Sequence, residues 1–262
     1  MIFSLAATLT LIAAAVAALR GPVGTTGTSW AVLLAAAAGP VARALAQGWL
    51  GWETGFANAL WVTIAVCMVV FLLLAAVTRQ SVRLAPFLLP YLVLLAISAT
   101  VWSQAAAPSL LAQSPSVWIV IHIATSVVTY ALLTLAAIAS AAVLVQEHML
   151  RRKKRHHFLE NLPSVADSER LELRLLLAAE LVLGLGIISG MAIELLATGS
   201  AIIFDHKTIF SLSAFVLIGL LLAAHYGIGL RGRRAARLAL AGYLLLTLAY
   251  PGVKFVTDVL LA

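Results

Sequence analysis

The sequence has little charge and almost no cysteine. Charged residues make up only 10% of the 262 positions and hydrophobic residues 63%, whereas soluble domains carry about a quarter charged residues. With a mean hydropathy of +1.08, this composition excludes an ordinary soluble domain and predicts an integral membrane protein. The one cysteine, Cys67, excludes disulfides within the chain, cysteine-based zinc clusters and covalent haem attachment through C-x-x-C-H.

Familiar catalytic and targeting motifs are also missing from the sequence. The first residues lack the basic segment of a secretory signal peptide, and their apolar run is long enough to span a bilayer. No hydrolase triad, P-loop or deaminase pattern occurs, and the long internal repeats of many transporters are not evident. GLGIISG (184–190) has the wrong spacing for a nucleotide-binding loop. Its Gly186 and Gly190 instead form a G-x-x-x-G pair, which allows a neighbouring helix to approach closely.

What the sequence does contain is a series of apolar runs of membrane-spanning length, about 20 residues each. Polar residues, glycines and prolines separate eight such runs: 2–19, 29–47, 57–77, 85–103, 117–147, 171–197, 206–229 and 236–258. We therefore expect an all-α, polytopic membrane protein with eight transmembrane helices. They form a single transmembrane domain, 1–262, with four helices in residues 1–103 and four in residues 117–258.

Lysine and arginine are unevenly distributed between the turns that connect these runs. If the even-numbered turns lie inside, nearly all of the 17 basic residues gather on one side, and only Arg43, Lys207 and Lys254 lie toward the other. The positive-inside rule then predicts that both termini lie outside the cytoplasm and that residues 151–170 form a cytoplasmic basic loop. The net charge of +7 is explained by helix ends that face anionic lipid, so we expect the lipid bilayer as a partner and not nucleic acid.

Ionisable side chains inside the predicted spans are the most informative residues, because each costs at least a few kcal/mol in a bilayer. In the stretch IFDHKTIFS, Asp205, His206 and Lys207 stand side by side where the span 206–229 begins. Asp205 suits a helix N-cap, and the other two suit interfacial residues that keep their polar ends in water. The alternative is that His206 binds a ligand at the outer face.

His122 lies near the predicted outer end of its helix, at the same level as His206. Neighbours at i±4 share a helix face, so Trp118 and Tyr130 are expected on or near the helix face that carries His122. Two neutral imidazoles on separate helices suit a six-coordinate b-type haem, so His122 and His206 are candidate metal ligands. The alternative for His122 is a hydrogen bond to another helix. His225 lies roughly 28 Å further along the helix that His206 begins, too far to share its metal.

The motifs of the second half follow a recognisable order. A histidine opens a long span and a tyrosine follows eight residues later, in IHIATSVVTYALL. An inner loop, the glycine-containing ERLELRLLLAAELVLGLGIISGMAIE and then DHKTIFSLSAFVLIGLLLAAHYGIGLRGRR come next. Over residues 117–256 this order resembles the cytochrome c assembly superfamily of haem-handling membrane proteins, of the CcsA/ResC and CcmC type.

Two features of that superfamily are missing. Between Glu194 and Asp205 the chain has only LLATGSAIIFD, where the family has its tryptophan-rich W-G-x-x-W-x-W-D motif. The sequence also ends soon after Gly252, before the position of the second outer histidine. The remaining pattern is similar to a shorter, eight-helix branch represented by YpjD and HemX, in which H-K-T-x-x-S and H-Y-x-x-G-x-R-G-R-R recur.

The resemblance implies particular roles for the polar residues. His122 takes the place of the family's first outer haem-ligand histidine, and His225 that of a histidine within the membrane, either a deeper ligand or a structural residue. His206 falls where the family has proline, and we expect it to replace the lost ligand. Lys207 and Lys254 are expected to pair with the haem propionates, with snorkelling as the alternative.

The resemblance also implies a function. We expect a protein of the bacterial inner membrane that binds haem b non-covalently and handles haem or assists cytochrome c assembly, as a binder and not an enzyme. Cytochrome c assembly proteins, or a cytoplasmic haem-synthesis enzyme bound through the loop 151–170, are the implied protein partners. The alternatives are electron transfer between haem and quinone, and a regulatory or scaffold role for that loop.

Overall fold

The computed structural model describes residues 2–21, 27–50, 55–78, 80–103, 117–152, 162–200, 203 and 205–257. Within these ranges every regular element is a helix: α1 (Ile2–Arg20), α2 (Gly27–Leu50), α3 (Phe56–Val77), η1 (Ser81–Leu84), α4 (Ala85–Val101), α5 (Val117–Arg151), α7 (Val165–Thr198), α8 (His206–Ile228), α9 (Arg233–Thr247), η2 (Leu248–Gly252) and α10 (Val253–Phe255). Eight segments of this described chain are long and apolar enough to cross a membrane. This confirms the expected all-α, multi-pass architecture.

The helix α7 begins earlier than the sequence pattern indicated. It starts at Val165, so the last residues of the predicted loop 151–170 belong to a helix. Ser164 is the N-cap: its hydroxyl accepts a hydrogen bond from the Asp167 backbone N–H at 3.1 Å and donates one to the Asp167 carboxylate at 2.6 Å. The bond from the Asp167 N–H satisfies a backbone donor of the first turn and starts a helix in polar sequence. The most basic part of the loop, 153–161, lies outside the described residues.

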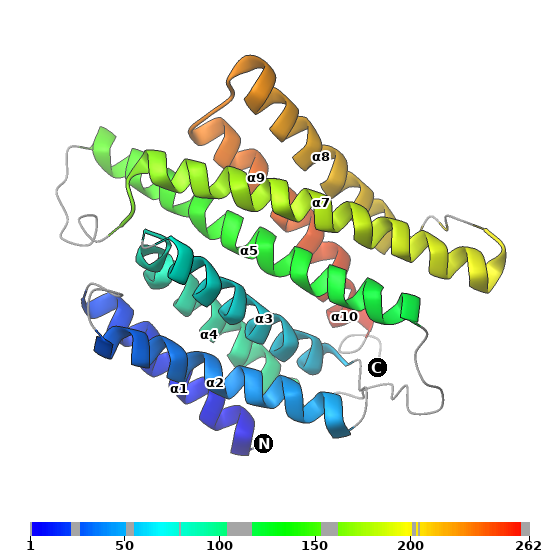
Figure 1. The fold of residues 1–262 in the computed structure, drawn as a ribbon, viewed down its shortest axis with the longest axis horizontal. Coiled ribbons are helices and arrows are strands. Elements are labelled where there is room, and N and C mark those ends of the chain that lie inside the picture. Colours follow the sequence, from blue (N-terminus) through cyan, green and yellow to red (C-terminus); the bar gives the residue numbers. More distant parts are fainter. Residues whose placement is uncertain are drawn as a thin grey trace.

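The helices form two groups, which Figure 1 shows in blue to cyan and in green to red. The helices α1 to α4 pack on one another in the first group, and α5, α7, α8 and α9 do so in the second. The long helices α5 and α7 lie side by side and form the most extensive contact in the structure, and α3 packs against α5 to join the groups. The interior of the first group includes fully buried Trp61, Phe71 and Cys67, so the thiol is a core residue.

The two ends of the bundle differ in chemistry. At one end, which we call the Asp205 end, α5 and α8 begin and α7 finishes. There the rings of Phe56, Trp102 and Phe255 pack edge to face, with centroids 5.3 to 6.2 Å apart, and connect α3, α4 and α10. At the other, the arginine end, α5 finishes and a short turn leads from α8 to α9.

The last span changes its helical geometry near the Asp205 end. Within η2 the hydrogen bonding widens to a π-helix, and Pro251 lies inside this segment. Proline has no N–H to donate to the preceding turn, which is the usual cause of such a local break. The break places Ala249 and Tyr250 against the space between α5, α7 and α8, where a cavity lies.

Candidate functional site

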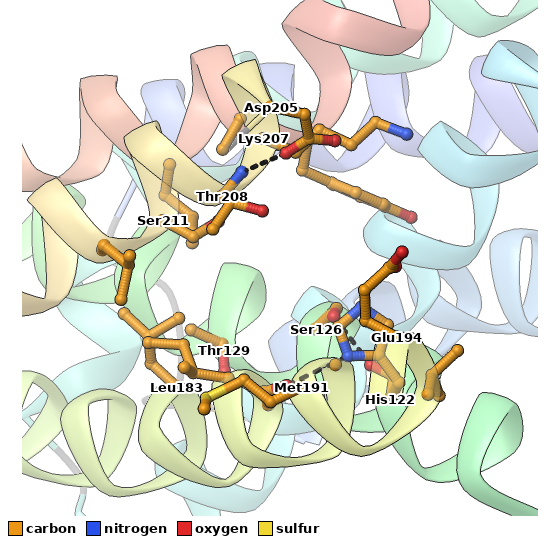
Figure 2. A pocket seen from close by; sticks show the side chains of 18 of the residues that line it. His122, Ser126, Thr129, Leu183, Met191, Glu194, Asp205, Lys207, Thr208 and Ser211 are labelled. Atoms are coloured by element: carbon orange, nitrogen blue, oxygen red, sulfur yellow. Dashed lines mark hydrogen bonds between the residues drawn. The ribbon is translucent and has the colours of Figure 1, made fainter. Parts of the chain in front are cut away.

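A cavity of about 490 Å³ lies at the Asp205 end, between α5, α7, α8 and η2 (Figure 2). This volume falls in the range of about 300–1,000 Å³ that is typical of ligand pockets. Its apolar wall comes from Leu183, Ile187, Met191, Ile193, Ile203, Leu212, Leu246 and Ala249. Its polar lining comes from His122, Ser126, Thr129, Glu194, Asp205, Lys207, Thr208, Ser211 and Tyr250. A cavity whose lining combines apolar and polar side chains suits an amphipathic ligand.

His122 is held in one orientation by α7. Its Nδ1 lies 3.0 Å from the carbonyl oxygen of Gly186 and 3.2 Å from the hydroxyl of Ser189. That carbonyl only accepts hydrogen bonds, and Ser189 also donates to it at 2.8 Å, so Nδ1 of His122 carries the proton. In the neutral ring Nε2 then keeps its lone pair. A histidine fixed through Nδ1–H to a carbonyl is the usual arrangement of a metal-ligating imidazole.

The close approach of α5 and α7 depends on two glycines. A Cβ atom at Gly190 would lie 3.0 Å from Cε1 of His122, and one at Gly186 would lie 3.4 Å from the Thr125 hydroxyl. The G-x-x-x-G pair therefore allows close helix packing, as the sequence predicted. At Gly190 the partner across the interface is the His122 ring itself.

The N-cap and first two turns of α8 form the opposite wall of the cavity, as Figure 2 shows for Asp205, Lys207, Thr208 and Ser211. Asp205 is the N-cap, and its carboxylate accepts a hydrogen bond from the Thr208 N–H at 2.7 Å. Partial burial acts to raise the pKa of Asp205, but the hydrogen bonds from Thr208 and the nearby cationic groups hold it below its ordinary value. The predicted N-cap role of Asp205 is confirmed.

Loss of this cap is expected to destabilise the protein. Asp205→Ala should lower the free energy of unfolding by about 1 kcal/mol, whereas Asp205→Asn, which also caps helices, should lower it less. Because the folded-state pKa of Asp205 is depressed, its contribution is present above the unfolded-state pKa and is lost as the pH falls through the folded-state value. Thermal unfolding in detergent at neutral and acidic pH measures both effects. Equal unfolding of both variants and wild type at neutral pH would contradict the capping role.

The structure separates some of the predicted ligand residues. His206 is the first residue of α8 and is exposed, and it does not line the cavity, although its neighbours Asp205 and Lys207 do. Trp118 lies one turn from His122 at the start of α5 and is exposed. The described residues contain no group of three or more His, Cys, Asp or Glu side chains placed to hold a metal ion. The cavity therefore offers one fixed imidazole, from His122.

Tyr130 belongs to a cluster of tyrosines from four segments: α4, α5, α9 and η2. Its hydroxyl is 3.1 Å from that of Tyr243, which also hydrogen-bonds to Tyr91. Its ring centroid is 5.9 Å from that of Tyr250, which lines the cavity. Four of the five tyrosines in the chain are thus in contact at the centre of the bundle. Tyr130 itself does not line the cavity, but it contacts Tyr250, which does.

The hydroxyl of Tyr243 holds this cluster together, so removing it is expected to destabilise the protein. Tyr243→Phe removes the oxygen that contacts Tyr91 and Tyr130, and a buried hydrogen bond contributes about 1 kcal/mol. Denaturant or thermal unfolding in detergent should show this loss. Tyr226→Phe is the matched control because Tyr226 is exposed. An equal response of the two variants would argue against a structural role for the cluster.

His225 and Lys254 lie away from the cavity. At the arginine end, Nδ1–H of His225 donates to the Leu230 carbonyl at 2.8 Å and closes the turn after α8, where Gly229 adopts φ +70°. This contact gives His225 a structural role. Lys254 is half-buried in α10 and does not line the cavity. Met191 and Tyr250, in contrast, line it without having been predicted as site residues.

Eight helices that are long and apolar enough to cross a membrane define a multi-pass membrane protein, and a ligand-sized cavity lies near one end of its second helix group. The family model described as "Cytochrome C assembly protein" matches residues 45–261, and the chain belongs to that family. It is 49% identical over 266 residues to the "Uncharacterized 28.8 kDa protein in nifR3-like 5′ region" of Azospirillum brasilense, with 100% of this chain and 98% of that protein covered. No solved structure matches the chain.

Proposed function

We propose that this protein binds haem b non-covalently in the cavity at the Asp205 end and handles haem for cytochrome c assembly. The carrying observation is His122, which lines the cavity with Nδ1 held by the Gly186 carbonyl and Nε2 left to bind a metal. The largely apolar lining suits a porphyrin, and the chain's membership of the cytochrome c assembly family supports a role with haem. Bound haem would supply an iron, and His122 would be one of its protein ligands.

For the second axial ligand we propose His206. It stands between two cavity-lining residues, Asp205 and Lys207, at the first position of α8. A side-chain rotation at an exposed helix start costs little, so His206 can turn toward the cavity when a ligand is present. Met191, whose thioether lines the cavity, is the competing ligand. Axial histidine and methionine give haem different absorption spectra and reduction potentials, so spectroscopy distinguishes the two.

Lys207 is the proposed partner of a haem propionate. It lines the cavity from α8, whereas Lys254 does not. Lys207→Gln is therefore expected to weaken haem binding about threefold to tenfold, the effect of one lost charge-assisted contact at a partly exposed site. Lys254→Gln is the matched control and should leave the affinity unchanged. Haem titration followed by absorbance measures both, and an equal loss in the two variants would contradict the assignment.

A spectrum of the purified protein tests the proposal directly. Wild-type protein supplemented with haem during expression or after purification should show a Soret band of a ligated b-type haem. A protein that remains colourless after supplementation, while folded and monodisperse, would refute the proposal.

The cellular setting is part of the same proposal. We place the Asp205 end outside the cytoplasm and the arginine end inside, in a bacterial inner membrane, because of the positive-inside distribution of lysine and arginine. We also propose that the chain is of the short, eight-helix, YpjD/HemX-like type. Cytochrome c assembly proteins, or a cytoplasmic haem-synthesis enzyme reached through the segment 151–170, are its proposed partners.

Electron transfer is a second candidate function, favoured by the tyrosine cluster. Tyr250 lines the cavity and contacts Tyr130, so an aromatic path leads from the cavity into the bundle. A haem that is reduced by a quinol, or oxidised by a quinone, at a useful rate would support this function. A haem that exchanges electrons with neither would leave haem handling as the function.

A further inference from the structure

A second cavity, of about 670 Å³, lies at the arginine end, far from His122 along the helix axes. It is formed by the end of α5 and the turn that leads from α8 into α9. Its lining carries one carboxylate, that of Glu147, and five guanidinium groups: Arg151, Arg231, Arg233, Arg234 and Arg237. This concentration of arginine around one hollow favours an anionic ligand.

The turn beneath these arginines is held in a fixed shape. His225 closes it through the Leu230 carbonyl, and Gly229 and Gly232 have φ values of +70° and +65°, which side chains rarely adopt. Gly232 packs against α5 so closely that a Cβ atom there would lie 2.8 Å from a carboxylate oxygen of Glu147. The Arg233 guanidinium lies 3.9 Å from the same carboxylate. Glu147 thus positions the turn, and the other arginines surround the hollow.

Two features leave donors at this pocket without a hydrogen-bonded acceptor in the described structure, although Arg233 also forms the 3.9 Å ion pair with Glu147. No side chain caps the first turn of α9, whose N-cap is Gly232. Nε of Arg233 is buried and has no hydrogen-bond partner among the described residues. Backbone N–H groups at a helix start together with arginine forks are the donors that bind phosphate oxygens.

We propose that this pocket binds a phosphate group, supplied by the headgroup of an anionic phospholipid. The wall of the hollow favours a lipid over a soluble anion, because Ile228 lines it and is 82% exposed, and Tyr226 nearby is 70% exposed. An exposed isoleucine and tyrosine beside an arginine cluster provide an apolar surface for acyl chains next to donors for the headgroup. The bound lipid would hold the α8–α9 turn against α5. This site is independent of the proposed haem site.

The test uses the full-length protein purified from nanodiscs of phosphatidylcholine with increasing amounts of phosphatidylglycerol. Native mass spectrometry counts the lipids that stay bound. We expect wild type to retain phosphatidylglycerol, and Arg234→Gln/Arg237→Gln to retain it at least about tenfold less. Arg83→Gln/Arg174→Gln is the matched control: it removes two exposed arginines from other elements and should behave as wild type.

Inorganic phosphate distinguishes the two sources of the ligand. We expect that millimolar phosphate does not displace the lipid, because the acyl chains also contribute to binding. If it does displace the lipid, the site recognises the phosphate group alone, which supports the phosphate chemistry. Equal losses in the two double variants, or no preference of wild type for phosphatidylglycerol over phosphatidylcholine, would overturn the proposal. The haem spectrum should be the same in all variants, so failure here is separate from failure of the haem site.

Discussion

Replacing His122 with alanine is expected to abolish the Soret absorbance of the haem-supplemented protein. His122 is the cavity's one imidazole among the described residues, and its orientation is fixed by the Gly186 carbonyl. Loss of a residue that only orients a metal ligand typically lowers affinity 10-fold to 100-fold. Loss of the ligand itself should lower it more. We therefore expect haem affinity to fall by at least about 100-fold.

Two further measurements separate ligation from folding. Added imidazole should restore part of the Soret band to His122→Ala, because it can occupy the space left by the ring. His225→Ala is the matched control, since His225 lies at the arginine end and bonds to the Leu230 carbonyl. His206→Ala should leave a haem with one protein ligand and a shifted spectrum. An unchanged spectrum in His122→Ala would contradict the assignment of this cavity as the haem site.

Gly190→Ala is expected to have the second largest effect. The new Cβ would lie 3.0 Å from Cε1 and 3.3 Å from Nδ1 of His122, tighter than normal packing allows. The ring must then move, and its hydrogen bond to Gly186 is lost or lengthened. We expect haem affinity to fall about 10-fold to 100-fold, as for other changes that misorient a metal ligand. Helix content by circular dichroism should remain close to wild type.

Gly184→Ala is the matched control because it is the same change on the same helix. Its Cβ would meet the Phe215 ring at 3.4 Å, which is an ordinary contact distance. We expect this variant to bind haem like wild type. If Gly184→Ala and Gly190→Ala weaken haem equally, the effect comes from α7 in general and not from the position of the His122 ring.

The sequence predicts the spans well because apolar runs of bilayer length leave few alternatives. Its main error is at the start of α7. There Ser164 caps the helix through the Asp167 N–H and also donates to the Asp167 carboxylate, so the helix begins in a polar segment before its apolar part. A serine followed three residues later by an acidic residue is a helix-start pattern. This signal was present in the predicted loop and identifies the true boundary.

The candidate site is predicted in part. The sequence identifies His122 and the Gly186–Gly190 pair, but it does not show that the glycines pack against that histidine. The sequence predicts that His122 and His206 lie at one depth because both stand near the start of a helix. Depth does not fix the direction in which a side chain points, so the sequence could not show that His206 is exposed outside the cavity. Tyr250 and Met191 were missed because a single aromatic or methionine in an apolar run has no distinguishing pattern, and only packing brings them to the cavity.

The most direct test of the central claim is a structure of the full-length protein loaded with haem, with the iron located by its anomalous scattering or by cryo-electron microscopy density. We predict that the iron lies at ligand distance from Nε2 of His122, in the cavity between α5, α7 and α8. A haem bound elsewhere, for example beside His225 at the arginine end, or a cavity occupied by lipid in a protein that is saturated with haem, would contradict the account.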